Sequence, residues 1–234
     1  MMGGCTHPEL KAGYIKRHNV AVEMIARSIM SGSRGRWLVV ADLKGDLVEE
    51  MSETLRQDVD TRMPRFMLPQ LQEEERRKLR PDLLFITGME EGWQYRCRSQ
   101  GEFQAQLQLM KDKCVVHLVE VGYCRDHKAV EKRSEKKRQH RLLAQKLQAE
   151  GWKVEQVPLV LGHCGSVYTP EMALVQGKLG VSKQDTERLF KELHKHAVRS
   201  LGYVARKYQE LRAARNRELG MGWPRRPARP RRPP

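Results

Sequence analysis

The sequence predicts an α/β domain whose mixed sheet of about four strands is flanked by helices. Four short apolar runs have the length of strands, and amphipathic segments with helical periodicity lie around and between them. At 234 residues the chain suits one well-buried core and is too short for two large catalytic domains. The hydrophobic share of 39% is gathered into these segments, so we expect a folded centre with polar, charged ends.

The first half predicts one helix and two strands. The segment YIKRHNVAVEMIARSIMSG (14–32) places apolar residues and His18 at helical spacing and ends at a glycine, which predicts an amphipathic helix. The apolar run RWLVVADL (36–43) has a β-branched centre and predicts a buried strand. A charged stretch over 44–80 follows, in which EEERRKLR predicts one exposed helical piece. LLFIT (83–87) is the second predicted strand.

The middle of the chain predicts two further strands and a helix between them. After a polar segment over 88–113, CVVHLVEV (114–121) is the run richest in β-branched residues, which predicts a third strand. HKAVEKRSEKKRQHRLLAQKLQAEG (127–151) predicts one long helix closed by its terminal glycine. WKVEQVPLVLG (152–162) predicts a fourth strand, in which Pro158 indicates an edge or a bend.

The last third predicts helices. Thr169 and Pro170 open a short helix through Leu174, with Thr as its cap and Pro in its first turn. A final helix is expected from about Lys183 to Arg217, with an apolar stripe. The stripe consists of Phe190, Leu193, Ala197, Leu201, Val204, Tyr208 and Leu211. We divide the chain into a linker over 1–13, a core over 14–182, a C-terminal helix over 183–218 that packs on or extends the core, and a disordered Pro/Arg-rich tail over 219–234.

The charge of the chain favours a polyanionic partner. Its formal net charge is +15, from 44 Lys and Arg against 29 Asp and Glu, so nucleic acid is the first candidate and an anionic membrane surface the second. No run approaches the roughly 18 apolar residues of a membrane-spanning helix, and the N-terminus lacks the apolar core of a signal peptide. We therefore expect a soluble, intracellular protein. Its five scattered cysteines fit reduced thiols better than a disulfide framework.

Two acidic residues stand at the ends of predicted strands. Asp82 follows a proline at the entry to the second strand, and Glu120 lies near the end of the third. Alternation along each strand puts Asp82 on one face with Leu84 and Ile86, and Glu120 on one face with Leu118 and Val116. If the strands pair antiparallel with 82 opposite 120, the apolar partners match and both acids lie at one end, roughly 5 Å apart. The other pairs in this register are Leu84 with Leu118 and Ile86 with Val116.

Two carboxylates so close are costly unless a positive group lies between them. A hard cation such as Mg²⁺ would remove the repulsion and could activate water against a phosphodiester. The alternative is that the strands pair otherwise, so that Asp82 belongs to a turn and Glu120 to a strand edge.

The long predicted helix places two further polar residues towards the sheet. Lys136 and His140 recur on one helical stripe with Leu143 and Leu147. A lysine beside a metal site could stabilise charge on an attacking hydroxide or a pentavalent phosphate. A lysine that snorkels at the margin of the helix is the alternative, and for His140 we favour a packing or orienting role. The residues expected to face mostly solvent are Lys132, Arg133, Lys137 and Arg138.

Five segments occur in an order and with a spacing that resemble one family. They are RHN in the first helix, RPDLLFITG, VVHLVEVGYCRD, EKKRQHRLLAQKLQAEGWKV and PLVLGHCGSVY. The chain resembles the C-terminal restriction-like endonuclease domain of site-specific non-LTR retrotransposon polyproteins, and the host-encoded fragments derived from them. The resemblance covers roughly residues 5–215.

The resemblance implies a PD-(D/E)xK restriction-endonuclease-like core that nicks target DNA, so that the free 3′ end primes reverse transcription by a domain upstream in the parent element. It implies that Asp82 and Glu120 ligate Mg²⁺ or Mn²⁺. The lysine that usually stands two residues beyond the second acid is absent, since Gly122 is there. Elements of this kind carry the lysine on the following helix in a Lys-x-x-x-Tyr arrangement, which falls on Lys136 and His140.

Several features depart from the family pattern. His140 stands where the pattern has tyrosine, and the polar segment 88–113 lengthens the interval between the acids. The family has a Cys-Cys-His-Cys zinc knuckle before the nuclease, of which Cys5 would be the last ligand. The other ligands would lie upstream of Met1, so we do not expect zinc binding.

The sequence thus leaves three classes of function open. The first is a retroelement-derived, metal-dependent DNA endonuclease in the nucleus. The second is a decayed or repurposed module that binds DNA or RNA without cutting it, and the third is an interaction protein built on the final helix. The Pro/Arg-rich tail suits a nucleic-acid clamp, a nuclear import signal or a translated non-coding sequence. The residues expected to contact nucleic acid are Arg17, His18, Lys132, Arg133, Lys137, Arg138, Arg225 and Arg226.

Overall fold

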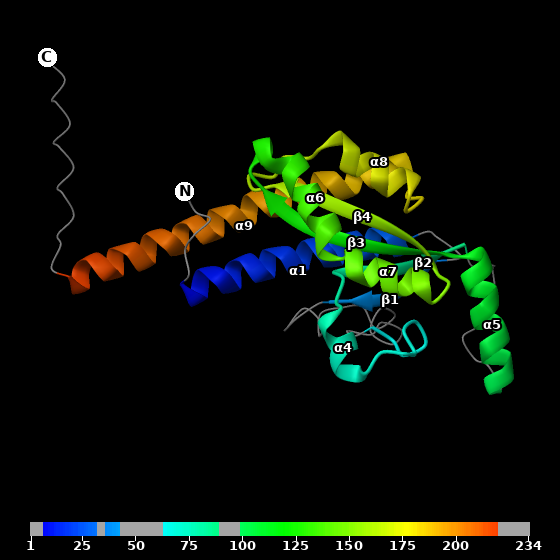
Figure 1. Cartoon of the computed structure of the whole chain (residues 1–234). Coiled ribbons are helices and arrows are strands. Elements are labelled where there is room, and N and C mark those ends of the chain that lie inside the picture. The colour runs from blue at the N-terminus through cyan, green and yellow to red at the C-terminus, as the bar shows by residue number, and fades with distance from the viewer. Residues whose placement is uncertain (1–6, 32–35, 43–62, 89–98, 220–234) are drawn as a thin grey trace, which may run out of the picture.

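The structure is a computed structural model, and it describes residues 7–31, 36–42, 63–88 and 99–219 (Figure 1). Cys5, the tail with Arg225 and Arg226, and most of the charged stretch before residue 63 lie outside the described residues.

A four-stranded mixed sheet forms the centre, as the sequence predicts. Its strands are β1 (Arg36–Ala41), β2 (Leu83–Thr87), β3 (Val115–Cys124) and β4 (Lys153–Gly162), and they lie in the order β1-β2-β3-β4. β1 and β3 both pair antiparallel with β2, and β4 pairs parallel with β3. β4 is therefore an edge strand, where the missing N–H of Pro158 is tolerated.

The register predicted for the second and third strands is confirmed. Leu84 pairs with Leu118 and Ile86 with Val116, so Asp82 and Glu120 stand at the next position of the same ladder. The alternative, in which the two strands do not pair in this way, is wrong.

Helices cover both faces of the sheet (Figure 1). They are α1 (Pro8–Met30), α4 (Glu73–Lys78), α5 (Gln100–Lys113), α6 (Ala129–Gln139), α7 (Arg141–Ala149), α8 (Thr169–Gly177) and α9 (Lys183–Glu218), with a 3₁₀ turn at Asp126–Lys128. α4 is the exposed helical piece expected in EEERRKLR, since none of its residues is buried.

The main differences from the sequence prediction lie in three places. α1 begins at Pro8, so the linker boundary at residue 13 falls inside a helix. Part of the polar segment 88–113 forms α5, whose first turn is capped by the Ser99 hydroxyl accepting the Glu102 N–H at 3.2 Å. The long helix is two helices, because the backbone at His140 leaves helical geometry (φ −108°, ψ 15°). The helical stripe continues across this break, so periodicity alone gives no sign of it.

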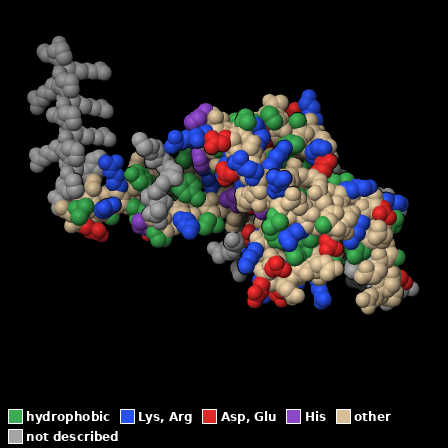
Figure 2. Space-filling model, in the orientation of Figure 1, with side chains coloured by type: hydrophobic (Ala, Val, Ile, Leu, Met, Phe, Trp, Pro, Cys, Tyr) green, Lys and Arg blue, Asp and Glu red, His purple; other side chains and the backbone are tan. Residues whose placement is uncertain are grey.

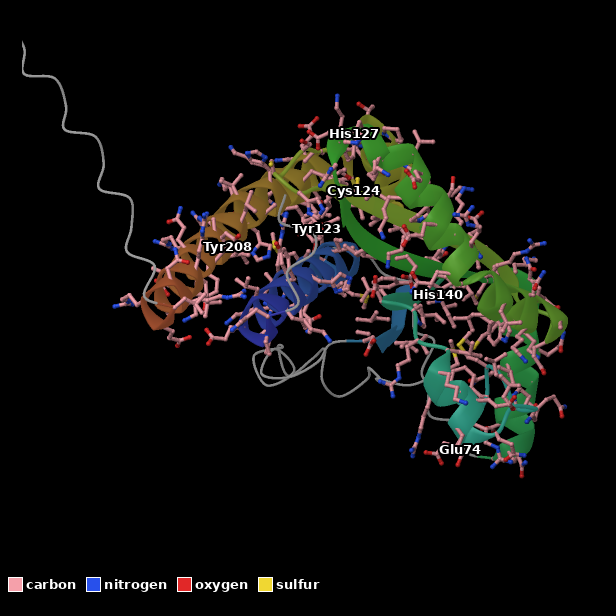
Figure 3. All side chains as sticks on the ribbon, turned by 60° about the vertical axis from the view of Figure 1, so that its left-hand side comes forward. Glu74, Tyr123, Cys124, His127, His140 and Tyr208 are labelled. Atoms are coloured by element: carbon pink, nitrogen blue, oxygen red, sulfur yellow. The ribbon has the colours of Figure 1, made fainter. Side chains whose placement is uncertain are left out.

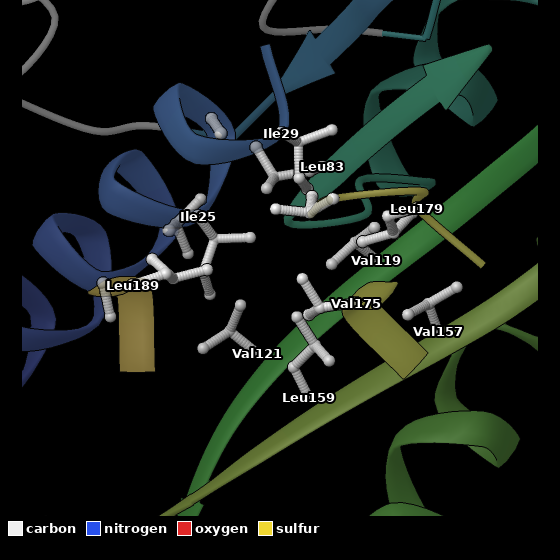
Figure 4. Packing of buried hydrophobic residues seen from close by; sticks show 14 of the residues in the cluster. Ile25, Ile29, Leu83, Val119, Val121, Val157, Leu159, Val175, Leu179 and Leu189 are labelled. Carbon is white, nitrogen blue, oxygen red and sulfur yellow. The ribbon is translucent and has the colours of Figure 1, made fainter. Parts of the chain in front are cut away.

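Each face of the sheet has its own core. On one face, alternate residues of β2, β3 and β4 pack against α1, α8 and α9 (Figure 4). Examples are Leu83, Val119 and Leu159, which lie in one cluster with Ile25 and Leu189. The other residues of the strands, such as Leu84 and Leu118, pack against α5, α7 and the 63–71 segment. The domain is thus a three-layer α/β arrangement.

α1 and α9 run antiparallel, and their far ends project beyond the sheet (Figure 1). His196 Nε2 contacts the Arg17 carbonyl at 3.0 Å, and a Cβ on Gly13 would lie 3.1 Å from Val204 Cγ2. Phe190, Leu193, Ala197 and Val204 are at most 3% exposed, so the first half of the predicted stripe packs within the chain. Towards the helix end Tyr208 is 37% exposed.

Among the described helices, none combines the length and the apolar character needed to cross a membrane.

Candidate carboxylate site

Asp82 lies where the two helical layers meet at the end of β2. Its Oδ2 accepts the backbone N–H of Val121 at 2.7 Å and lies 3.3 Å from Nε2 of His18, which comes from α1 on one face. Lys136, from α6, places its Nζ 3.8 Å from the same oxygen. Asp82 is therefore not a solvated turn residue, because three elements beyond its own strand engage a single carboxylate oxygen.

Glu120 lies beside it on β3 and is almost fully buried, at 4% exposed. Its Oε1 accepts the backbone N–H of Asp82 at 3.0 Å, and its Oε2 accepts a hydrogen bond from Lys136 Nζ at 3.2 Å. His140 Nε2 approaches Oε1 to 2.9 Å. This last contact is not a hydrogen bond, and His140 Nε2 has no hydrogen-bond partner among the described residues. His140 and Glu120 are therefore close enough to interact electrostatically, without a hydrogen bond between them.

Lys136 bridges the two acids from the neighbouring helix. A Cβ built on Gly122 would lie 3.2 Å from Lys136 Cε and 3.4 Å from Lys132 Cε, so the lysine side chains occupy the space that a side chain at 122 would fill. The glycine at position 122 thus leaves the room in which the Lys136 side chain reaches the two acids. Strand and helix periodicity together predict that Lys136 faces the sheet, and the structure confirms this.

The backbone break at His140 lies next to these acids. The side chain lies at the joint between α6 and α7 and turns towards the sheet (Figure 3). It is 7% exposed, which agrees with the packing or orienting role favoured by the sequence. A shallow surface hollow lies beside it. The hollow is lined by Leu118, Glu120, Lys136, Lys137, His140, Gln156, Val157 and Pro158.

The electrostatics of the site stabilise a charged Asp82. Burial raises the pKa of Asp82, but the hydrogen bond to His18, the charges of His18 and Lys136, and the Val121 N–H outweigh it, so the pKa lies below its ordinary value. Burial lowers the pKa of His18, but the hydrogen bond and charge of Asp82 outweigh burial and raise it above 6.5. Asp82 and His18 therefore stabilise each other's charged form.

His18 is the site residue that the sequence placed in another role. The sequence counted His18 among the residues expected to contact nucleic acid, whereas its ring points to Asp82 and also contacts the Val121 carbonyl at 3.3 Å. The available signal was the polar residue on the apolar stripe of α1, since a polar side chain facing a core requires a polar partner there. The sequence did not identify Asp82 as that partner.

Two other expected nucleic-acid contacts are engaged inside the protein. Arg17 is 2% exposed, stacks 3.9 Å over the ring of Tyr123 and donates to the His163 carbonyl at 2.6 Å. Arg133 donates through Nη2 to Glu171 at 3.0 Å, and Glu171 is fully buried. Arg133 was expected to face mostly solvent, and that expectation is wrong for its guanidinium. Neither guanidinium therefore belongs to a surface that contacts phosphate.

Of the remaining basic residues of α6, two face outwards. Lys137 and Arg138 are exposed, and Lys132 is partly exposed and paired with Glu135 at 2.6 Å. Lys and Arg side chains gather over the region of α6 on the face shown in Figure 2. This face suits contact with a polyanion.

Asp82, Glu120, Lys136, His140 and His18 form one cluster, which we call the carboxylate site. Within the described ranges, no set of three or more His, Cys, Asp and Glu side chains is arranged to hold a metal ion. The donor set nevertheless fits a hard cation, because two carboxylates already share one cationic group, the ammonium of Lys136. Comparisons of the chain with protein-family models, with curated proteins and with solved structures found no match.

Proposed function

We propose that the chain is a retroelement-derived, metal-dependent DNA endonuclease domain with a PD-(D/E)xK core, which nicks one strand of target DNA. One observation carries the proposal. Two carboxylates from adjacent antiparallel strands lie at one end of the sheet and share the ammonium of a lysine that reaches over a glycine. The five segments that resemble the restriction-like endonuclease domain support the same assignment. Action on chromosomal DNA would take place in the nucleus.

Asp82 and Glu120 would hold the ion, Mg²⁺ or Mn²⁺, through their carboxylate oxygens. When bound, such an ion polarises the phosphodiester and lowers the pKa of a water ligand. Lys136 would stabilise negative charge that develops on the phosphate, since its ammonium already lies beside both acids. His18 would keep Asp82 charged and fix its orientation.

Nicking of supercoiled plasmid tests the proposal. We expect the purified chain to convert supercoiled DNA to open circles with Mg²⁺ or Mn²⁺ and not with chelator. Asp82→Ala and Glu120→Ala should both abolish nicking, while Glu131→Ala, which removes an exposed acid on α6, should not change it. Nicking that persists in both site variants would refute the assignment of these acids.

A second candidate function is a nucleic-acid-binding module that no longer cuts. The close engagement of both acids by Lys136, and His140 in place of the tyrosine of the family pattern, favour it. It predicts salt-sensitive binding to DNA without nicking, unaffected by Asp82→Ala or Glu120→Ala. The plasmid assay and a binding assay on the same variants therefore separate the two candidates.

A further inference from the structure

The projecting ends of α1 and α9 form a two-helix arm, which we define as residues 8–17 and 198–218 (Figure 1). Leu10 and Val204 are buried, at 2% and 3% exposed, and Val204 Cγ2 would lie 3.1 Å from a Cβ on Gly13 of the other helix. Lys207 forms ion pairs with Glu9 at 2.9 Å and with Glu210 at 3.6 Å. The arm is thus held together by its own apolar and ionic contacts.

The outer surface of the arm carries an excess of positive charge. Five exposed arginines lie on its α9 part: Arg199, Arg206, Arg212, Arg215 and Arg217. The acids of the same part are Glu210, which pairs with Lys207, and Glu218 near the helix end. Exposed arginines in such excess attract a polyanion, and they disfavour the pairing of this surface with an identical copy.

Two tyrosines alternate with these arginines. Arg199, Tyr203 and Arg206 stand at i, i+4 and i+7, so they share one side of α9. Tyr203 is 55% exposed and its ring lies over Gly13, where the two helices approach closely. Tyr208 follows on the projecting part of the helix (Figure 3). Arginine and tyrosine side chains both donate hydrogen bonds to phosphate oxygens.

The arm begins at the carboxylate site. His196 of α9 contacts the carbonyl of Arg17, and the next residue of α1, His18, contacts Asp82. Arg199 therefore stands one helical turn beyond a residue anchored next to the site. Arg199, Arg206 and Arg217 stand at i, i+7 and i+18, so they lie on one side of α9. From the first to the last the helix rises by about 27 Å, which is the length of about eight base pairs of duplex DNA.

We propose that the arm binds duplex DNA that flanks the phosphate in the carboxylate site, with Arg199, Arg206 and Arg217 on the phosphate backbone. The proposal rests on the proposed function, because that function supplies the DNA. The contacts carry no base readout, so the arm would position DNA without selecting its sequence.

Binding of a 30-base-pair fluorescent duplex, followed by anisotropy with chelator present, tests the arm without cutting. The variant is the double substitution Arg199→Glu with Arg206→Glu. The matched control is Lys183→Glu with Lys191→Glu, which makes the same charge change on exposed residues near the other end of α9. We expect the arm variant to lose about tenfold or more in affinity, and its slope of log affinity against log salt to fall by about two. The control should stay within about twofold of the unmodified chain.

The outcomes separate this proposal from the nuclease assignment. Equal affinities of the arm variant and the control would overturn the role of the arm, while metal-dependent nicking by the unmodified chain would still support the nuclease. Loss of nicking in Asp82→Ala with normal duplex binding supports both. An arm variant that binds DNA normally but shifts the sedimentation coefficient would assign the arm to contact between copies and overturn the proposal. Melting by circular dichroism must show that both double variants remain folded.

Discussion

α6 supplies two cations, three residues apart, to two very different carboxylate environments. Arg133 meets Glu171 of α8 one to one, with two N–H groups donating to the two oxygens of a fully buried carboxylate. Lys136 meets two carboxylates at once, and two histidines complete the cluster. In the first pair one guanidinium faces one carboxylate, and two donors match two acceptors. In the second cluster two carboxylates share one lysine, so the acids outnumber the permanently charged cations.

This difference separates a structural ion pair from a candidate site. A buried pair whose donors and acceptors match has no further chemistry to perform, and its removal harms only stability. Two acids that share one lysine depend on histidine protonation or on an added cation for their balance, so their state responds to pH and to metal. The comparison predicts that substitutions in the first region change stability alone, whereas substitutions in the second also change the response to pH or to metal.

Loss of the balanced pair should have the largest effect on stability. Arg133→Leu leaves the Glu171 carboxylate buried without a partner, so we expect the free energy of unfolding to fall by about 3 kcal/mol. Denaturant unfolding measures this change, with Arg138→Leu, an exposed neighbour on α6, as the control. The double variant Arg133→Leu with Glu171→Met should recover much of the loss. A fall no larger than that of the control would show that the pair does not stabilise the fold.

Loss of Lys136 should cost less and should create a response to metal. In Lys136→Met the acids lose their shared cation but keep the Val121 and Asp82 N–H groups, so we expect a loss of about 1–2 kcal/mol. Because a divalent ion would replace the lysine between the acids, Mg²⁺ should raise the melting temperature of this variant more than that of the unmodified chain. Equal shifts in both proteins, at matched ionic strength, would contradict a cation site here.

The two regions also differ in how far the sequence predicted them. The β2–β3 register was predicted by placing Asp82 opposite Glu120, which also matches Leu84 with Leu118, and the structure has this pairing. Asp82, Glu120 and Lys136 followed from that register and from one helical stripe. These are local patterns, and local patterns were enough to bring three residues of the site together.

Contacts between elements far apart in sequence were not predictable in this way. Glu171 stands in the first turn of a short helix, where an acid is ordinary, and only the packing of α8 near α6 makes it the partner of Arg133. The pairing of His18 with Asp82 likewise needs the position of α1 over the end of the sheet. The break at His140 leaves the periodicity of the helix unchanged, so no pattern in the sequence marks it.

A smaller effect should come from the pH dependence of His18. Its pKa is raised and that of Asp82 is lowered, so their interaction stabilises the fold fully between the ordinary values, 3.8 and 6.5. It is lost as pH rises through the raised pKa of His18, or falls through the lowered pKa of Asp82. His18→Gln should therefore lower stability by about 1 kcal/mol near pH 5 and by less near pH 9.

Melting of both proteins across this pH range measures the difference. His127→Gln, which removes an exposed histidine, should show no such trend. A constant gap between His18→Gln and the unmodified chain would mean that His18 acts through packing alone.

The smallest change in stability, and the sharpest test of the shared lysine, should come from Gly122→Ala. The new Cβ would meet Lys136 Cε at 3.2 Å and Lys132 Cε at 3.4 Å, and both belong to flexible side chains that can move. We therefore expect the free energy of unfolding to change by no more than about 0.5 kcal/mol. The displaced ammonium would no longer lie 3.2 Å from Glu120, so nicking should fall although the fold is intact. Gly101→Ala, an exposed position on α5, should leave nicking unchanged. Full nicking by Gly122→Ala would show that the position of Lys136 over the glycine is not needed for the reaction, and the carboxylate site would then depend on its two acids and His18.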